Sequence, residues 1–418
     1  MKVLHLCYSD LAGGAARAAY RLHIAQRKFG MDSHMLVINK LSDDPYVHSV
    51  SKRKQLWIKG LNYITNKFLK LQKYNNNVFH SINIIPSGLI KYINHLSPDI
   101  VNLHWVGSNM LSISEIARIQ QPVVWTLHDM WAFSGCEHYE DLNNINRYRC
   151  DYNDDLTKNK NYVDLNKIIF KFKRNKFKKN KITIITPSNW LGECAKNSSL
   201  FKKNNVVTIS NCIDHTVFKP VDKLFSREVL GLPEKVPLIL FGAMASTSDI
   251  RKGYMLLKIA MQKLKERNVY FNCELVVFGA SKKNEINEFG IKTHYVGNIV
   301  DDATLCLLYS AADAFIAPSL QDNLPNTLVE SLACGTPCIA FNIGGMPDLI
   351  PSKAFGQLVD DVDSGSLADA IYTQLSSEKK FDAKKLAMQS AILRDEEVVA
   401  SRYLKVYNDI LSELNVAK

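Results

Sequence analysis

The most informative stretch of the sequence is residues 319–350, which read SLQDNLPNTLVESLACGTPCIAFNIGGMPDLI. Within it, residues 326–333 have the pattern of a short helix, and the apolar run at 337–341 has that of a buried strand. A further apolar run at 314–317 comes just before the stretch. A strand, a polar loop, a helix and a second strand in this order predict one unit of a parallel α/β sheet. Ligands bind such sheets at the carboxyl ends of the strands, where the polar loop would lie.

The same alternation extends over both halves of the chain. The apolar runs that we expect to be strands lie at 2–7, 35–38, 99–103, 122–127, 182–186, 206–209, 237–241, 274–278, 293–296, 314–317 and 337–341. The turn-rich stretch NCIDHTVFKP at 211–220 suits a crossover between domains, and 418 residues are enough for two or three domains of about 150 residues each. We predict two Rossmann-like, doubly wound parallel α/β domains, 1–212 and 213–395, that face an interdomain cleft. A helix within 396–418 would pack back on the first domain.

Composition and cysteine usage exclude several classes of protein. Apolar residues make up 46% and charged residues 22%, which excludes a disordered or fibrous chain. The first apolar run, at 3–7, is short, and no window approaches the roughly 18 apolar residues of a spanning helix, so we expect neither a signal nor a membrane span. The nine cysteines show no regular pairing, and we expect reduced thiols. Cys136, His138 and Cys150 lack a clear fourth ligand, so we expect no metal.

Basic residues outnumber acidic ones by 52 to 41, and the excess gathers in two stretches with interleaved apolar residues. They are KRKQLWIKGLNYITNKFLKLQK at 52–73 and KIIFKFKRNKFKKNK at 167–181. One interpretation lays them on an anionic membrane surface, with the aromatic side chains toward the acyl boundary. The other makes each an amphipathic helix packed on its own domain with a solvated basic face. Both stay open, whereas we expect no nucleic-acid partner, because no nucleic-acid-binding motif accompanies the charge.

Two small groups of residues have the pattern of a ligand site. Gly13 and Gly14 lie between the first expected strand and helix, where missing side chains let backbone amides approach a phosphate or sugar, although a tight turn also explains them. Asp322 falls in the loop before the helix at 326–333, and Glu330 falls on its second turn. The first acid would face a ligand at the helix N-terminus, and the second could accept hydrogen bonds from the vicinal hydroxyls of a ribose. A dipole-complementing carboxylate plus a solvated glutamate is the alternative.

Further motifs accompany the two acids. They are ACGTP at 333–337, GGMPDLI at 344–350, His128-Asp129 after VVWTL, TPSNW at 186–190, NCID at 211–214 and Arg251-Lys252-Gly253. Together with Gly13-Gly14 and the spacing Asp322-x7-Glu330, this set resembles the retaining family-4 glycosyltransferases of the bacterial surface-polysaccharide type, which have the GT-B fold. The resemblance covers nearly the whole chain.

The resemblance implies a metal-independent transfer of a sugar from a nucleotide diphosphate donor to an acceptor hydroxyl, with retained anomeric configuration and no cofactor. Glu330 would bind the donor ribose. The catalytic residues would be Asp322 on the transferred sugar, Lys252 on the diphosphate and His128 beside the reacting sugar. A packed, hydrogen-bonded histidine is the alternative for His128. The residues implied to contact the donor are Gly13, Gly14, Arg251, Lys252, Asp322, Asn323, Leu324 and Glu330.

Two positions depart from the family pattern. Asp322 stands where the family usually has glutamate. Ala243 stands where the family commonly has an arginine, directly after the glycine that ends a strand, here Gly242. Either Arg251 supplies the missing charge or Lys252 alone holds the diphosphate.

The partners implied are a nucleotide-sugar donor and a glycan or lipid-linked acceptor, which would place a cytoplasmic protein at the inner face of the plasma membrane. Two other functions stay open on this fold. One is a nucleotide-sugar 2-epimerase, and the other is a catalytically degenerate binding scaffold.

Overall fold

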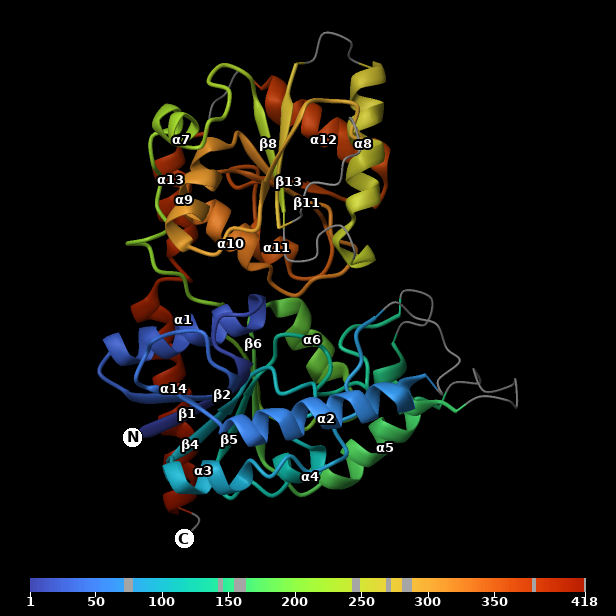
Figure 1. Ribbon diagram of the computed structural model, residues 1–418, viewed down its shortest axis with the longest axis vertical. Helices are drawn as coiled ribbons and strands as arrows, with labels where there is room; N and C mark the ends of the chain where they lie inside the picture. The colour runs from blue at the N-terminus through green and yellow to red at the C-terminus, as the bar shows by residue number, and fades with distance from the viewer. Residues whose placement is uncertain are drawn as a thin grey trace. The chain divides into compact units, whose positions relative to one another are not determined.

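The computed structural model describes residues 1–70, 78–141, 146–153, 163–242, 249–267, 272–279, 288–377 and 381–416. The chain divides into two compact units (Figure 1). One comprises Met1–Cys212 together with Glu396–Lys418, and the other comprises Ile213–Asp395. Each unit is a parallel sheet covered by helices on both faces.

The first unit is built on a seven-stranded sheet with the order β3-β2-β1-β4-β5-β6-β7. Its strands are β1 (Lys2–Ser9), β2 (Asp32–Asn39), β3 (Val47–Ser49), β4 (Ile100–Leu103), β5 (Val123–Thr126), β6 (Ile182–Thr186) and β7 (Val206–Thr208). Successive side chains of a strand point to opposite faces, so Val3 packs in one core layer while Leu4 and Leu6 pack in the other. Both faces of the sheet are therefore buried, as expected for parallel strands.

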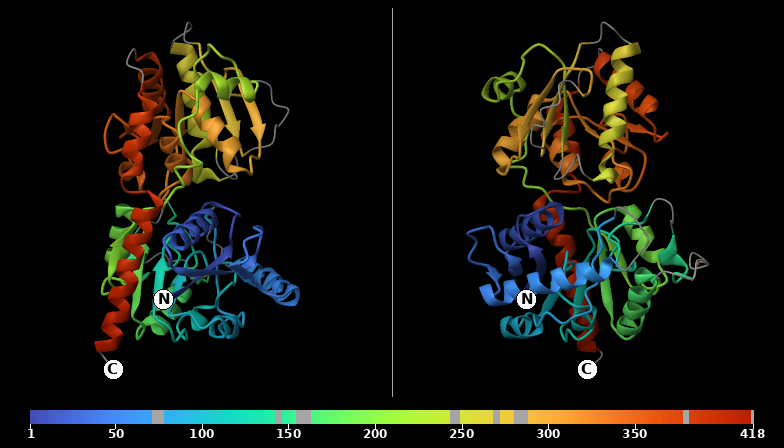
Figure 2. Two further views of the ribbon diagram at one scale, coloured as in Figure 1. Left: turned by 90° about the vertical axis from the view of Figure 1, so that its left-hand side faces the viewer. Right: turned by 45° about the vertical axis from the view of Figure 1, so that its right-hand side comes forward.

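Helices cover both faces of this sheet. They are α1 (Gly14–Lys28), α2 (Lys52–Leu69), α3 (Ile90–Leu96), α4 (Ile113–Ile116), α5 (Leu165–Phe177), α6 (Asn189–Asn197) and α14 (Glu396–Val416). The last of these follows the second unit in sequence but packs beside α1 on the first unit (Figure 2). Its Tyr403 and Tyr407 are buried in one core layer with Val3 of β1.

The second unit has a six-stranded sheet with the order β10-β9-β8-β11-β12-β13. The strands are β8 (Leu238–Gly242), β9 (Glu274–Phe278), β10 (Thr293–Gly297), β11 (Ala314–Ala317), β12 (Cys338–Phe341) and β13 (Gly356–Val359). The helices are α7 (Lys223–Val229), α8 (Tyr254–Arg267), α9 (Asp302–Ala311), α10 (Asn326–Ala333), α11 (Met346–Leu349), α12 (Ser364–Ser376) and α13 (Ala383–Ala391). Ile239 packs with α8 and α12, whereas its neighbour Leu240 packs with α9 and α10.

The strand orders confirm the predicted pair of doubly wound parallel sheets. In each sheet the order reverses beside the first strand, between β1 and β4 and between β8 and β11. Loops leave such a switch point in opposite directions, which opens a crevice for ligands at the carboxyl edge. Of the residues implied to be functional, Gly13 and Gly14 follow β1, Lys252 follows β8 and Asp322 follows β11, whereas His128 follows β5.

One of the two basic stretches, 167–181, packs one side into the core of the first unit. In α5, which contains most of 167–181, Ile169, Phe170 and Phe177 are buried in the core. Lys173 is buried as well, and its ammonium donates to three backbone carbonyls, among them that of Gly135 at 2.7 Å. The interpretation of a packed amphipathic helix therefore describes α5, which places Phe170 and Phe177 in the core. No helix among the described residues has the length and apolar character to cross a bilayer.

Candidate functional site

Lys252 and Asp322 meet at the carboxyl edge of the second sheet. Lys252 ends a 3₁₀ turn, η3 (Ile250–Lys252), in the connection after β8, and Asp322 lies in the loop after the neighbouring strand β11. The ammonium Nζ lies 2.5 Å from the carboxylate Oδ2, and the two side chains are only 22% and 11% exposed. The structure thus brings together two of the three residues implied to be catalytic.

Backbone contacts between the two loops fix the position of Lys252. The amide of Leu320 donates to the carbonyl oxygen of Arg251 at 2.6 Å. Gly253 has a φ of +69°, and a Cβ at this position would lie 1.7 Å from the carbonyl oxygen of Pro318. Only glycine permits both this backbone conformation and this approach.

The loop after β12 fixes the position of Asp322 in the same way. Gly344 has a φ of +56°, and a Cβ there would lie 2.1 Å from the carbonyl oxygen of Asp322. That oxygen accepts a hydrogen bond from the amide of Gly345 at 3.2 Å. The side-chain Oδ1 of Asp322 accepts from the amide of Asn323 at 3.0 Å. The carboxylate is therefore held by its own loop as well as by Lys252.

Glu330 occupies the second turn of α10, as the sequence predicted. Its side chain is buried, and the hydroxyl of Tyr309 donates to Oε2 at 2.9 Å. Asn323 and Leu324, between the two acids, are also buried. The arrangement buries a carboxylate on the second turn of the helix, where a neighbouring hydroxyl holds it.

Arg251 forms a fork with Asp249 within its own turn. Nη2 lies 2.6 Å from Oδ2 and Nε lies 3.2 Å from Oδ1 of this aspartate. The guanidinium is thus already matched by one carboxylate. Ala243, where the family commonly has arginine, lies outside the described residues.

Gly13 and Gly14 lie where β1 passes into α1, at the carboxyl edge of the first sheet. Gly13 has a φ of +98°, and a Cβ there would meet no atom within 4 Å, so its backbone conformation alone favours glycine. Helix α1 begins at Gly14 and has no acidic residue in its first turn. The positive end of the helix dipole therefore lies at this edge without a carboxylate of that turn to offset it.

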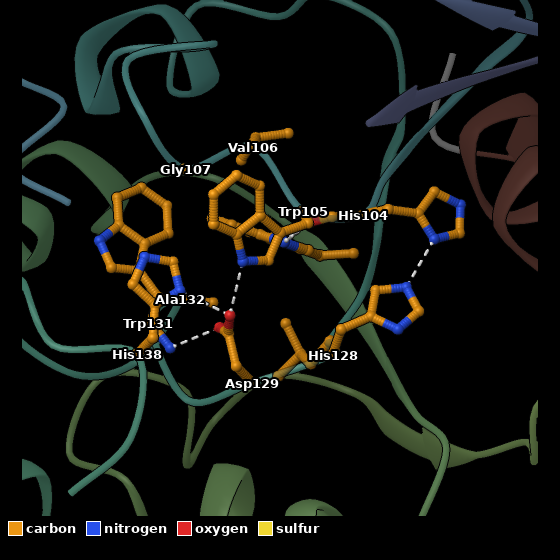
Figure 3. Close-up of a pocket in the computed structure, with 11 residues that line it drawn as sticks. His104, Trp105, Val106, Gly107, His128, Asp129, Trp131, Ala132 and His138 are labelled. Carbon is orange, nitrogen blue, oxygen red and sulfur yellow. Dashed lines mark hydrogen bonds and ion pairs between the residues drawn. The ribbon is translucent and has the colours of Figure 1, made fainter. Parts of the chain in front are cut away.

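His128 follows β5 after one leucine and lines a small pocket at the same edge (Figure 3). The pocket is lined by His104, Trp105, Val106, Gly107, Trp125, Leu127, His128, Asp129, Trp131, Ala132 and His138. Nε2 of His128 lies 3.0 Å from Nδ1 of His104. Burial lowers the pKa of His128 to about 4 against a smaller opposing effect of Asp129, so the imidazole is neutral near pH 7.

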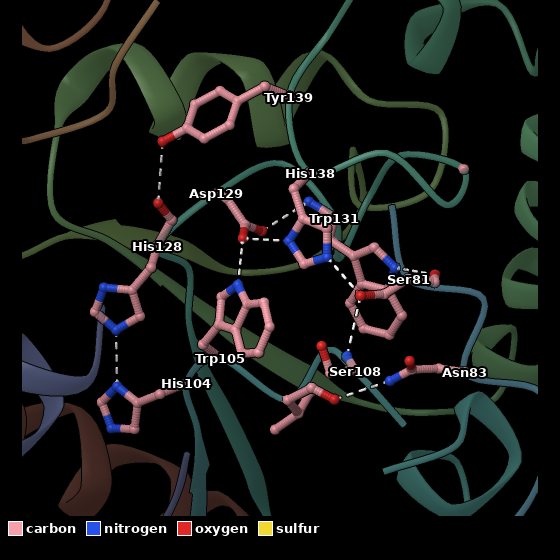
Figure 4. A network of polar contacts seen from close by, with 12 residues as sticks. Ser81, Asn83, His104, Trp105, Ser108, His128, Asp129, Trp131, His138 and Tyr139 are labelled. Carbon is pink, nitrogen blue, oxygen red and sulfur yellow. Dashed lines mark hydrogen bonds and ion pairs between the residues drawn. The ribbon is translucent and has the colours of Figure 1, made fainter. Parts of the chain in front are cut away.

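A second polar chain crosses this pocket, from Asp129 through His138 to Ser81 (Figure 4). Oδ2 of Asp129 lies 2.6 Å from Nδ1 of His138, whose Nε2 lies 2.8 Å from Oγ of Ser81. The order matches that of a hydrolytic triad, but the serine is buried and also accepts from the amide of Ser108 at 3.0 Å. A Cβ on Gly107 would come within 2.9 Å of the same Oγ. This series of hydrogen bonds therefore positions Asp129, and it leaves no room for a substrate at Ser81.

Asp129 is an ionised anchor for the aromatic wall of the pocket. It accepts from the indole nitrogen of Trp105 and from the backbone amide of Trp131, each at 2.9 Å. Burial alone would raise the pKa of its carboxyl. His138 and the hydrogen bond from the backbone amide of Trp131 outweigh burial and hold the pKa below its ordinary value. Trp105 and His138 stack with their ring centroids 5.2 Å apart.

The sequence patterns did not indicate His104 or Trp105, and they indicated His138 only as a possible metal ligand. His104 and Trp105 directly follow β4 in sequence. His128 and Asp129 come after β5 in a similar way, separated from it by one leucine. Histidine and tryptophan directly after a buried strand were the available signal. His138 has no such signal, because a long loop returns it to the sheet edge.

The predicted absence of a metal centre rested on cysteine spacing. Within the described ranges, no three His, Cys, Asp or Glu side chains are grouped so that they could hold a metal ion. Cys136 is buried with its Sγ 2.6 Å from Oδ1 of Asn166, and Cys150 is exposed. The nine cysteines, all within those ranges, form no disulfide.

Comparison with known families agrees with this fold and these motifs. Residues 12–217 match the family model described as Glycosyltransferase Family 4, and residues 237–377 match the model described as Glycosyl transferases group 1. Two parallel sheets with these strand orders and loop motifs define the GT-B class of proteins. The chain belongs to the family-4, group 1 glycosyltransferases within that class.

Individual relatives are distant. Phosphatidyl-myo-inositol mannosyltransferase of Mycobacterium leprae is 28% identical over 197 residues, which are 46% of this chain and 51% of that protein. The chain thus spans about half the length of this relative. Sucrose-phosphate synthase from Thermosynechococcus elongatus has a TM-score of 0.66 at 17% identity, covering 99% and 100% of the two chains. HepE from Anabaena, solved with UDP and glucose, has a TM-score of 0.63 at 15% identity, covering 98% and 100%. These two structures support the GT-B fold.

Proposed function

We propose that this protein transfers a sugar from a nucleotide diphosphate donor to an acceptor hydroxyl with retention of anomeric configuration. The observation that carries the proposal is the Lys252–Asp322 pair, locked by backbone contacts at the carboxyl edge of a sheet that matches the group 1 model. The second unit would bind the donor. HepE, which shares the fold, was solved with UDP and glucose, and this supports a nucleotide-sugar donor here.

Each site residue of the second unit has a specific chemical role in this proposal. Breaking the bond between the sugar and the diphosphate leaves negative charge on the diphosphate, and the ammonium of Lys252 stabilises that charge in place of a metal ion. Both cations have a carboxylate partner, but that of Lys252 is Asp322 of the proposed site, whereas that of Arg251 is Asp249 of its own turn, so we assign the main positive charge to Lys252. Asp322 orients the transferred sugar, and Glu330 accepts hydrogen bonds from the ribose hydroxyls. Asn323 and Leu324 shape the loop between these acids.

The first unit would bind the acceptor and complete the reaction. The amino end of α1, at Gly13 and Gly14, attracts the diphosphate through the helix dipole. His128 acts beside the reacting sugar as a neutral imidazole. The stacked indole of Trp105 offers an apolar wall of the kind that sugar rings contact.

The acceptor is proposed to be a glycan or a lipid-linked glycan at the inner face of the plasma membrane, in the synthesis of a cell-surface polysaccharide. A membrane-lipid acceptor in the name of the Mycobacterium leprae relative supports this choice. Helix α2 supports it independently. While Ile58, Leu61 and Thr65 are buried, the rest of the helix exposes large apolar side chains. These are Leu56 (67%), Trp57 (50%), Tyr63 (65%), Ile64 (44%) and Phe68 (49%).

The exposed residues of α2 form one stripe, because positions one, seven, eight and twelve residues after Leu56 share a helix face. Exposed cations lie beside and within the stripe, and residues 52–70 contain no acid. Tryptophan and tyrosine beside lysine suit the boundary between anionic headgroups and acyl chains. We therefore assign the proposed membrane contact to α2 and not to α5. The remainder of the basic stretch, 71–73, lies outside the described residues.

The proposal is tested by incubating the purified protein with a panel of nucleotide sugars, with and without lipid-linked glycan acceptors, and analysing products by mass spectrometry. A glycosylated acceptor and a released nucleotide diphosphate are expected. A sugar epimer formed without acceptor would replace the proposal by a 2-epimerase. No product, together with no thermal protection by any nucleotide diphosphate, would leave a binding scaffold.

A further inference from the structure

Three histidines of the first unit form a series of hydrogen bonds that runs from the buried His5 and His104 to the partly buried His128. Nε2 of His128 lies 3.0 Å from Nδ1 of His104, which follows β4 (Figures 3 and 4). Nε2 of His104 lies 2.9 Å from Nδ1 of His5 on β1. Nε2 of His5 lies 2.9 Å from the amide oxygen Oε1 of Gln26 on α1. One connected series of side chains therefore crosses three neighbouring strands.

The far end of the chain is anchored on α14. The amide nitrogen of Gln26 donates to the hydroxyl of Tyr407 at 3.2 Å, and Asn102 donates to the same oxygen at 2.8 Å. The side-chain amide oxygen of Asn102 in turn accepts a hydrogen bond from the hydroxyl of Thr126 at 3.0 Å. Gln26, Asn102 and Tyr407 are fully or almost fully buried. With its nitrogen directed at Tyr407, the amide of Gln26 turns its oxygen toward His5.

This orientation decides where each proton of the chain lies. An amide oxygen only accepts, so Nε2 of His5 carries a proton, and in a neutral imidazole the other nitrogen then accepts. Nδ1 of His5 therefore takes a hydrogen bond from Nε2–H of His104. By the same rule Nδ1 of His104 takes one from Nε2–H of His128. Gln26 fixes the tautomer of all three rings.

The rings meet the condition of neutrality. Burial lowers the pKa of His5 to about 3 and holds that of His104 well below its ordinary value, with nearby histidines adding to both effects. Burial lowers the pKa of His128 to about 4. Each ring near pH 7 thus has one N–H donor and one acceptor nitrogen.

We propose that Gln26, His5 and His104 are positioning residues that hold His128 as the neutral tautomer with its proton on Nε2. The inference rests on the proposed function for its use in catalysis. His128 then enters the reaction neither as an imidazolium cation nor as the Nδ1–H tautomer. A substrate group that contacts Nδ1 has to donate a hydrogen bond, which a sugar hydroxyl does and a carboxylate does not.

The tautomers are measured directly by ¹⁵N-detected imidazole NMR on the full-length, histidine-labelled protein at pH 7.5. His128 is assigned from the resonances missing in His128→Asn. We expect a protonated Nε2 and an unprotonated Nδ1 for His5, His104 and His128. A protonated Nδ1 on His128 would overturn the inference.

Gln26→Leu and Gln26→Glu form a matched pair of variants. Leucine removes the acceptor, so His128 becomes a mixture of tautomers, and turnover falls by roughly tenfold through kcat with little change in KM. Glutamate keeps an acceptor facing His5, and at a pH where His5 stays neutral it restores the single tautomer. Tyr407→Phe supplies a second route, because it releases the amide of Gln26 to turn. An unchanged His128 spectrum in both Gln26→Leu and Tyr407→Phe contradicts the inference.

The spectra separate this inference from the proposed function. Expected tautomers in a protein that transfers no sugar would remove the proposed function and leave the positioning chain. Sugar transfer by a protein whose His128 carries its proton on Nδ1 would do the reverse.

Discussion

Lys252 Nζ lies 2.5 Å from Oδ2 of Asp322 at the carboxyl end of β11. A second lysine and aspartate form a similar pair at the amino end of the same strand, where Nζ of Lys223 lies 2.6 Å from Oδ1 of Asp313. Distance alone does not distinguish the two pairs. The edge of the sheet does, because ligands of doubly wound sheets bind at the carboxyl ends of the strands.

Lys252→Ala is expected to lower kcat by about 10²–10³-fold, since it removes the cation that stabilises the leaving diphosphate. Lys223→Ala is the matched control and should leave turnover within a factor of two or so. Initial rates of sugar transfer, with folding checked by circular dichroism, provide the measurement. Full activity of Lys252→Ala would refute the assigned role.

Tyr309→Phe tests the support of Glu330. The change removes the hydroxyl that donates to the buried carboxylate at 2.9 Å, and we expect a loss of about 1–3 kcal/mol in stability together with weaker nucleotide binding. Tyr295→Phe is the control, because it removes a hydroxyl 2.7 Å from Glu288 elsewhere in the unit. Thermal shift with UDP compares the two. Equal UDP protection in both variants would show that Tyr309 supports only the fold.

The sequence predicted the helices and strands around this site whose apolar residues recur with a clear helical or strand period. The helix at 326–333 is present as α10, and all eleven expected strands are found. Strands β3 and β13 were missed, since each is a three- or four-residue edge strand placed by pairing with β2 or β12 and not by an apolar pattern of its own. The interdomain cleft stays a prediction.

Contacts that depend on tertiary folding escaped the sequence. The lysine-rich pattern of α5 gave no sign that Lys173 is buried, because three carbonyls and the ring of Trp131 replace the solvent around its ammonium. Likewise, the role of Gln26 requires that β1, β4 and α14 be assembled first. Motif matches found Asp322 and Lys252, but the backbone contacts that join them are visible only in the fold.

Gly344→Ala should lower both activity and stability. The residue has a φ of +56°, and the new Cβ would meet the carbonyl oxygen of Asp322 at 2.1 Å, so the loop that carries this acid has to move. Gly297→Ala controls for the backbone term, since Gly297 has a φ of +72° but nothing within 4 Å of the added Cβ. Alanine in the left-handed region costs about 1–2 kcal/mol at either site. Activity lost equally in both variants would contradict a specific effect on Asp322.

The exposed stripe of α2 is expected to bind anionic vesicles. Trp57→Ser combined with Phe68→Ser should reduce sedimentation with vesicles of phosphatidylglycerol and phosphatidylcholine, because both side chains would leave the acyl boundary. Ile168→Ser, at a 52% exposed position of α5, is the control and should bind as the wild type does. Binding that is unchanged in the double variant would remove the membrane contact from α2.

Acid should destabilise the protein before its carboxylates are protonated. Burial, assisted by nearby cationic groups, lowers the pKa of His23 to about 3, and burial lowers that of His128 to about 4, whereas both are near 6.5 in the unfolded chain. The unfolded chain therefore takes up protons first as the pH falls through 6.5, and stability present above that pH is lost progressively toward pH 3–4. Each buried histidine costs up to about 1.4 kcal/mol per pH unit in this window. Urea unfolding at pH 7.5 and pH 5.5 measures the slope. His23→Gln should flatten it and the exposed His95→Gln should not, whereas a slope unaffected by His23→Gln would assign the acid sensitivity to other groups.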